Sequence, residues 1–335
     1  MASRSVTLSG RWGEPIYAQF DYWRNPVRVG VDAQHPNGQN PLLLYRHGGA
    51  GITGHHQVLR TDAYGDTFFP VHWLGGVHAS SNPGSRWDVC AFTSGQQRHL
   101  EFFTPFIPPF PRSVSLWFPD SIRDCQRAIA SIKGQAVSLG FNPRKVVGWG
   151  DSYGATLLGL SQLAPPFGGG NRRSVWRDNT NELANHDSTL RALVFHIGQI
   201  DCRKIGGVDY LHYTNVGGWW GTRTDNSAEF DALPDTVRAM ASIRAYFEAG
   251  EVGGYRNWFT AYVSGLGSGT KPFTDPHDTV QFSELNTAIT NAGLTNGSQL
   301  RAAGGWTNTL WPANPGATEL ALYQAIDTHL AASIL

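Results

Sequence analysis

Short apolar runs, separated by turns rich in glycine and proline, recur along this chain of 335 residues. Runs of this length with few polar positions are typical of strands that are buried on both faces of a sheet. The pattern predicts strands at residues 15–20, 27–31, 41–45, 87–92, 145–149, 192–197, 258–263 and 299–303.

Segments with helical spacing of apolar residues alternate with these strands. The clearest one begins at Asp120 or Ser121 and continues to Gly140, which we expect to end the helix because glycine readily adopts the left-handed conformation found there. Strands that alternate with helices favour an α/β fold built on a mostly parallel sheet. Further helices are predicted at residues 155–160, 235–249, 283–292 and 318–332.

Residues 202–257 interrupt this alternation. The segment contains the run Gly-Gly-Trp-Trp-Gly at 217–221, followed by the helix predicted at 235–249. We interpret it as a cap inserted over a site rather than as a separate domain. The expectation is therefore a single domain over residues 1–335, with a cap insertion at about 202–257.

One short motif joins the strand predicted at 145–149 to the helix predicted at 155–160. It reads Gly150-Asp151-Ser152-Tyr153-Gly154, so a serine stands at the apex of a strand-turn-helix unit. Such a unit is the nucleophile elbow of hydrolases, in which glycines two residues before and after the serine avoid steric clashes. The motif alone also fits an ordinary glycine-rich turn, and its interpretation depends on what surrounds it.

A second glycine-rich turn follows the strand predicted at 41–45. It reads His47-Gly48-Gly49-Ala50-Gly51, and a turn with so few side chains lets backbone N–H groups point into a site. An oxyanion hole requires donors of this kind.

Taken together, these motifs resemble the α/β-hydrolase superfamily, and most closely the carboxylesterases of the hormone-sensitive-lipase type. The resemblance covers residues 41–163: the strand into His47-Gly48-Gly49, the helix from Asp120, and the elbow, in that order. It implies an α/β-hydrolase fold with a cap insertion and the cleavage of carboxylic esters. A small-molecule ester is then the expected substrate, and no cofactor is expected.

The resemblance also implies roles for individual residues. Ser152 would be the nucleophile, and Asp278 lies where the family places its acid. The oxyanion hole would be formed by backbone N–H groups of Gly48, Gly49, Ala50 and Tyr153.

Two neighbours of these residues have a structural interpretation. His47 is expected to support the oxyanion loop. Asp151 either matches the residue that the family has before its serine or caps the helix that follows.

The catalytic base is where the chain departs from the family. A serine hydroxyl needs a base to take its proton, and the family supplies a histidine on the loop after the last strand. Here Trp306 stands about where that histidine is expected, and no histidine occurs between His277 and His329. We expect His329, within the last predicted helix, to be a surface residue.

Three explanations stay open. His277 could act as the base, oriented by Asp278, Asp275 or Asp201. His55 or His56, beside the oxyanion loop, could take its place. Alternatively, the catalytic triad is broken and the protein binds a ligand without turning it over. A further alternative keeps the acyl-enzyme but transfers the acyl group to an alcohol or an amine.

Composition narrows the possible partners. Acidic and basic residues balance at 26 each, which gives no reason to expect a nucleic-acid partner. The three cysteines have no CxxC spacing, and their odd number argues against a disulfide framework. Asp275, His277 and Asp278 alone make a poor zinc set, so no metal is expected.

The sequence also bears on the location of the protein. We expect no membrane span, because no apolar run reaches the necessary length. Since the first residues lack the apolar core of a signal peptide, we expect a cytoplasmic protein, or a secreted one if a leader has been removed.

Overall fold

The structure is a computed structural model. It describes residues 2–9, 15–25, 39–48, 87–93, 120–163, 187–212, 228, 231–252, 257–263, 266–301 and 317–334.

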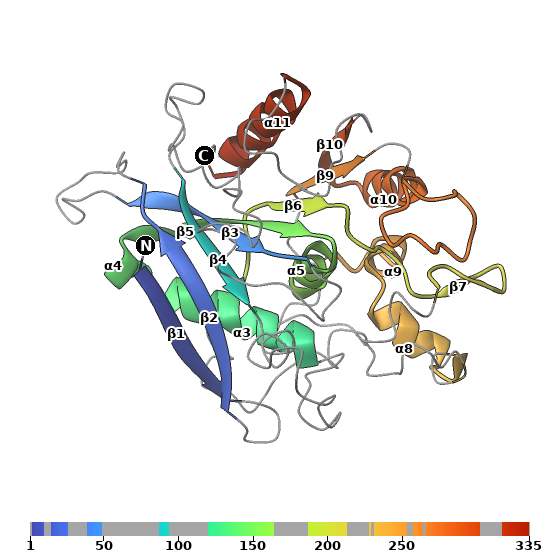
Figure 1. Ribbon diagram of the computed structural model, residues 1–335, viewed down its shortest axis with the longest axis horizontal. Coiled ribbons are helices and arrows are strands. Elements are labelled where there is room, and N and C mark those ends of the chain that lie inside the picture. Colours follow the sequence, from blue (N-terminus) through green and yellow to red (C-terminus); the bar gives the residue numbers. More distant parts are fainter. Residues whose placement is uncertain are drawn as a thin grey trace, which may run out of the picture.

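An eight-stranded sheet forms the centre of the described structure (Figure 1). Its strand order is β1-β2-β4-β3-β5-β6-β9-β10. The first two strands and β4 pair antiparallel, whereas the six strands from β4 to β10 run parallel. The strands are β1 (Ala2–Ser9), β2 (Pro15–Trp23), β3 (Asn40–Arg46), β4 (Asp88–Thr93), β5 (Phe141–Asp151), β6 (Leu193–His196), β9 (Asn257–Val263) and β10 (Thr295–Arg301).

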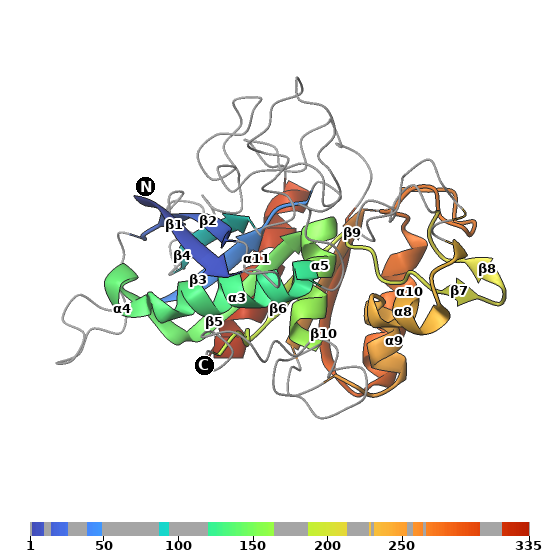
Figure 2. The same ribbon diagram turned by 90° about the horizontal axis from the view of Figure 1, so that it is seen from below.

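Helices cover both faces of this sheet. Figures 1 and 2 show α3 and α5 on one face and α11 on the other. A sheet covered on both faces explains why its central strands are continuous apolar runs, as the sequence predicted. The helices are α3 (Asp120–Gly134), α4 (Ala136–Leu139), α5 (Tyr153–Leu163), α8 (Asp235–Met240), α9 (Ile243–Glu248), α10 (Val280–Asn291) and α11 (Ala317–Ile334).

Alternate residues of the strands supply two separate cores. In β3, Leu42 and Leu44 pack on the side of α3 and α5, whereas Leu43 and Tyr45 pack on the side of α11. The same alternation in β5 sends Val146 to the first core, and Val147 and Trp149 to the second. This alternation follows from the two-residue period of a strand.

Most of the predicted elements are present with shifted ends. The helix predicted from Asp120 to Gly140 is two helices, α3 and α4, with a turn at Gln135 between them, and Gly140 ends α4 with a left-handed φ of 81°. The helix predicted at 235–249 is two helices, α8 and α9, because a turn at Ala241 and Ser242 separates them. The last strand spans Thr295–Arg301, earlier than predicted, and β1 was not predicted. The strand predicted at 27–31 lies outside the described residues.

The segment interpreted as a cap is described only in parts. It contains the short hairpin of β7 (Lys204–Ile205) and β8 (Val208–Asp209), followed by α8 and α9. Figure 2 shows these elements together with α10 at one end of the molecule. The run at 217–221 lies outside the described residues, and the cap remains a prediction.

None of the helices in the described part of the chain is long and apolar enough to cross a membrane.

Candidate functional site

Ser152 occupies a strained turn between β5 and α5. Its φ is +52°, a left-handed conformation that residues with a side chain adopt at a cost of about 1–3 kcal/mol. The elbow glycines are required by close backbone packing. A β-carbon on Gly154 would lie 2.3 Å from the carbonyl oxygen of Arg46, and one on Gly150 would lie 2.5 Å from the Cα of Ala155. The interpretation of this motif as a nucleophile elbow therefore agrees with its geometry.

The Ser152 side chain is in hydrogen-bond contact with a histidine. Its Oγ lies 2.8 Å from Nε2 of His277, which belongs to the loop between β9 and α10. The serine is 9% exposed, and the imidazole is 27% exposed, so one side of the pair can be reached. Of the histidines that the sequence offered as a base, His277 is the one placed against Ser152 in the described structure. His55 and His56 lie outside the described residues, as does Trp306.

Asp275 is the carboxylate beside this imidazole. Its Oδ1 lies 3.3 Å from Nδ1 of His277 and also accepts the backbone N–H of His277 at 2.8 Å. The side-chain hydrogen bond to His277 lowers the pKa of Asp275, although partial burial acts in the opposite direction. An ionised Asp275 therefore faces the nitrogen of His277 that points away from Ser152.

Asp278, expected as the acid, is placed differently. It is buried, and its two oxygens accept the backbone N–H groups of Gly269, at 2.8 Å, and Val280, at 2.9 Å. The structure does not bring its carboxylate into hydrogen-bond contact with the His277 side chain. A residue that holds backbone groups on both sides of a loop shapes that loop.

Asp201, the other carboxylate considered as the acid, is engaged by Arg203. The guanidinium donates to both of its oxygens, with contacts of 2.6 and 2.9 Å. The buried Asp201 carboxylate is therefore neutralised by Arg203, and no hydrogen bond or ion pair joins it to His277 in the described structure.

A buried glutamine anchors the loop that carries His277. Gln281 is fully buried, and its Nε2 donates to the carbonyl of Pro276 at 2.7 Å. Its Oε1 accepts the backbone N–H of Ile200, which lies after β6, at 3.2 Å. The side chain therefore ties the residue before His277 to the neighbouring strand end. The sequence analysis missed it, because nothing in the pattern marks one glutamine at a helix start.

The expected oxyanion loop begins beside the nucleophile. A β-carbon on Gly48 would lie 3.0 Å from Cβ of Ser152, so the backbone of the loop passes close to the nucleophile. Tyr153 directly follows Ser152 as the first residue of α5. Gly49 and Ala50 lie outside the described residues, and the oxyanion role of all four residues stays a prediction.

Two residues with a structural interpretation are both buried. His47 contacts the guanidinium of Arg46 at 2.8 Å and the carbonyl of Gly48 at 2.9 Å, which agrees with support of the loop. The Asp151 carboxylate accepts hydrogen bonds from the side chains of Tyr45, Trp149 and His196. The sequence analysis missed His196, although a polar residue at the end of the strand beside β5 was a usable signal.

His329 is a correction to the sequence analysis. We expected a surface residue, but the side chain is half buried and packs edge-on against Phe259, with 5.5 Å between ring centroids. Burial lowers the pKa of His329. The helix α11 places this side chain against Phe259 of β9 and close to Gly297 of β10.

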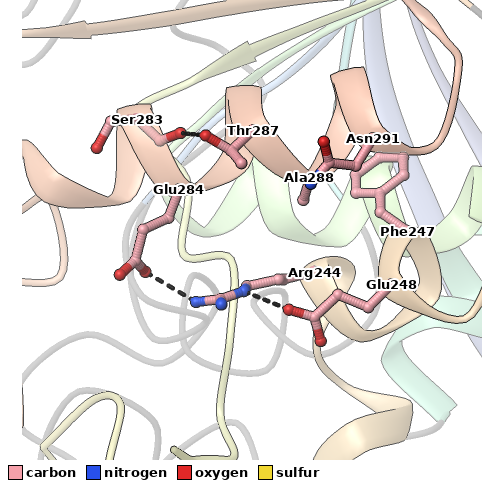
Figure 3. A pocket seen from close by; sticks show the side chains of 8 residues that line it. All are labelled: Arg244, Phe247, Glu248, Ser283, Glu284, Thr287, Ala288 and Asn291. Carbon is pink, nitrogen blue, oxygen red and sulfur yellow. Dashed lines mark hydrogen bonds and ion pairs between the residues drawn. The ribbon is translucent and has the colours of Figure 1, made fainter.

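A separate cavity of about 410 Å³ lies between α9 and α10 (Figure 3). Arg244 crosses it and pairs with Glu248 on one side and Glu284 on the other. Each of these glutamates also pairs with a second cation, Arg203 and Lys271 respectively. Neither Ser152 nor His277 lines it. Among the described residues, no group of three or more histidine, cysteine, aspartate or glutamate side chains could hold a metal ion.

Comparisons with known proteins address the fold. The sequence matches no protein-family model and no curated protein. Solved structures match over nearly the whole chain. Esterase 2 of Thermogutta terrifontis, phosphoramylated by tabun, is 11% identical with a TM-score of 0.59, over 98% of this chain and 94% of its own. An esterase of Pyrobaculum calidifontis is 14% identical with a TM-score of 0.56, and the match covers 100% of this chain and 87% of the esterase. Carboxyl esterase 2 of the fungus Tuber melanosporum is 12% identical with a TM-score of 0.58, and the match covers 100% of this chain and 88% of the fungal esterase.

These likenesses and the strand order establish the fold. The chain has the α/β-hydrolase fold, with a mostly parallel central sheet flanked by helices. The solved structures that it resembles are named as esterases.

Proposed function

We propose that this protein is a serine hydrolase that cleaves carboxylic esters through an acyl-enzyme on Ser152. The observation that carries the proposal is the 2.8 Å contact between Ser152 Oγ and His277 Nε2 at a strained elbow. The fold supports it, because the solved structures of the same fold reported above are esterases.

His277 acts as the general base in this proposal. Its Nε2 takes the proton of Ser152 as the serine oxygen attacks the ester carbonyl, and the imidazole becomes an imidazolium. Asp275 stabilises that imidazolium and fixes its orientation, because its carboxylate lies 3.3 Å from Nδ1. Asp275 takes the acid's role in place of Asp278.

The reaction then proceeds in two stages, acylation and deacylation, each through its own tetrahedral intermediate. Backbone N–H groups of the oxyanion loop and of Tyr153 hold the negative oxygen of each intermediate. The imidazolium gives its proton to the departing alcohol, which leaves the acyl group on Ser152. A water molecule, activated by the same imidazole, attacks the acyl-enzyme and releases the carboxylic acid together with free Ser152.

The contact with His277 argues against the alternative of a ligand-binding protein without a base. That alternative rested on the missing histidine after the last strand, and the contact of His277 with Ser152 supports a base that comes from another loop. Acyl transfer to an alcohol or amine uses the same acyl-enzyme and differs only in the final acceptor.

The test is hydrolysis of a short-chain p-nitrophenyl ester by the wild type and by Ser152→Ala. We expect the variant to lose at least about 1,000-fold in kcat, because both acylation and deacylation require the serine oxygen. The control is Ser138→Ala, since Ser138 is an exposed residue of α4 whose hydroxyl donates to the carbonyl of Gln135. Equal rates in the wild type and Ser152→Ala would refute the proposal.

A further inference from the structure

Four buried side chains form a polar cluster directly beneath the nucleophile. We call Tyr45, Trp149, Asp151 and His196 the Asp151 cluster. The Asp151 carboxylate accepts from the Tyr45 hydroxyl at 2.6 Å, from the Trp149 indole N–H at 3.0 Å and from Nδ1 of His196 at 2.7 Å. Three convergent donors suit a carboxylate, which offers only acceptors when ionised.

Each donor comes from a strand that ends at the site. Tyr45 lies on β3, Trp149 on β5 and His196 on β6, and these three strands are adjacent and parallel. Tyr45 is paired in register with Trp149, and Asp151 is paired with His196. One carboxylate therefore joins the carboxyl ends of three neighbouring strands, on the face that α11 covers.

The burial of the Asp151 carboxylate costs free energy unless its three hydrogen-bond donors stay in place. Asp151 and Trp149 are fully buried, and His196 and Tyr45 are 1% and 4% exposed. A carboxylate that is removed from water is tolerated only when donors replace the lost hydration. Burial and the Asp151 carboxylate together raise the pKa of Tyr45 well above its usual value, so its hydroxyl keeps its proton and stays a donor.

The cluster is connected to Ser152 through the backbone as well. The N–H of Ser152 donates to the carbonyl of His196 at 2.9 Å. The next residue, Ile197, has a φ of +45°, which is a rare conformation for a β-branched side chain. Both strained residues thus directly follow a member of the Asp151 cluster.

We infer that the Asp151 cluster is a positioning device that holds Ser152 Oγ at the distance and angle from His277 that the reaction requires. The inference rests on the proposed function. The side-chain bonds of Asp151 and His196 fix the two strand ends between which Ser152 is held, and a shift of about 1 Å at such a site can lower a rate about 100-fold.

A second cluster in the same sheet provides a matched control. Asp88 is also fully buried and accepts from the Tyr22 hydroxyl, from the backbone N–H of Asn25 at 2.9 Å and from Nδ2 of Asn40 at 3.2 Å. Asp88 and Asn40 are the first residues of β4 and β3, so this cluster lies at the amino ends of the parallel strands. Ser152 lies at the opposite ends.

The experiment compares Tyr45→Phe with Tyr22→Phe. Each variant removes one tyrosine hydroxyl that donates a hydrogen bond to a buried aspartate, so we expect similar losses in Tm. Only Tyr45→Phe should change the reaction, with kcat about tenfold lower and KM within about twofold of the wild type. The rate at which a fluorophosphonate labels Ser152, normalised to the folded fraction, should fall in parallel.

Rescue at His196 provides a second measurement. His196→Leu removes the donor, and we expect kcat to fall about 100-fold. His196→Asn places an amide N–H near the position of Nδ1 and should restore most of the rate.

Wild-type kcat per folded molecule in Tyr45→Phe would overturn the inference, as would equal rates for His196→Leu and His196→Asn. A wild type that labels at Ser152 while Tyr45→Phe labels equally fast contradicts only the positioning role. Absence of labelling in the wild type contradicts the proposed function itself, and the inference with it.

Discussion

Ser152 Oγ and His277 Nε2 lie 2.8 Å apart, although 125 positions separate them in the sequence. The histidine comes from the loop after β9, whereas the family that the sequence resembles places its base after the last strand. The contact is possible because β5 and β9 run parallel, so the loops that follow them lie at the same end of the sheet.

Replacement of the base tests this arrangement most directly. We expect His277→Ala to lower kcat for a p-nitrophenyl ester by about 100- to 10,000-fold, because the serine loses its proton acceptor. His329→Ala serves as the control, since this histidine packs against Phe259 and away from Ser152. Full activity in His277→Ala would show that another histidine, such as His55 or His56, is the base.

Substitution of Asp275 should lower activity, whereas substitution of Asp278 should lower stability. Asp275→Asn is expected to lower kcat about 100- to 10,000-fold with little change in Tm, because the partly exposed carboxylate contacts His277 Nδ1. For Asp278→Asn we expect mainly a lower Tm, because its buried oxygens hold Gly269 and Val280. Measurement of kcat and Tm on both variants decides the matter, and the opposite division of effects would assign the acid to Asp278.

Gln281→Met should loosen the loop that carries His277. Methionine fills a similar volume but leaves the carbonyl of Pro276 and the N–H of Ile200 without their buried partner. Loss of buried hydrogen-bond partners costs about 1–3 kcal/mol each. We therefore expect a lower Tm together with a lower kcat in steady-state assays. A lower Tm with wild-type kcat would mean that the loop keeps His277 in place without this anchor.

Two glycine substitutions should give opposite results. Gly154→Ala forces a β-carbon to 2.3 Å from a backbone oxygen, and we expect failure to fold or a loss of several kcal/mol, as for other severe overpacking. Gly134→Ala, at the end of α3, has open space around the new carbon and should be neutral or stabilising by about 0.5–1 kcal/mol. Urea denaturation measures both, and a stable Gly154→Ala protein would refute the tight elbow.

The buried imidazole of His329 should make stability depend on pH. Burial lowers its pKa, so the unfolded chain binds a proton more readily than the folded chain. This contribution to stability is fully present above the ordinary histidine pKa of about 6.5 and is lost as the pH falls below that value. His329→Leu removes it, so the free energy of unfolding should fall less between pH 7 and about pH 5.5 than in the wild type. Identical pH dependence in both proteins would contradict the prediction.

Sequence patterns were sufficient for the fold because its main features are local. Continuous apolar runs such as 41–45 identify strands covered on both faces, and Gly140 marks a helix end through its own conformational freedom. The Ser152 motif likewise depends on neighbours in the sequence, since Gly150 and Gly154 are needed by the turn itself.

The sequence narrowed the candidate partners of Ser152 to a few residues but did not show which of them meet in the folded chain. Asp275, His277 and Asp278 lie within four positions, and only the path of the loop determines which carboxylate meets Nδ1 of the imidazole. The Asp151 cluster was beyond the sequence analysis for a similar reason. Its members come from three strands, and their register is a property of the assembled sheet.

The spacing of Asp275 and His277, two residues apart on one loop, has a consequence for how the activity can be lost. Enzymes that take base and acid from separate loops must order two segments, each at its own entropic cost. Here the loop between β9 and α10 orders both groups together. A single proteolytic cut or a short insertion in that loop would therefore displace His277 and Asp275, the proposed base and acid, at once, while Ser152 and the sheet beneath it stayed intact.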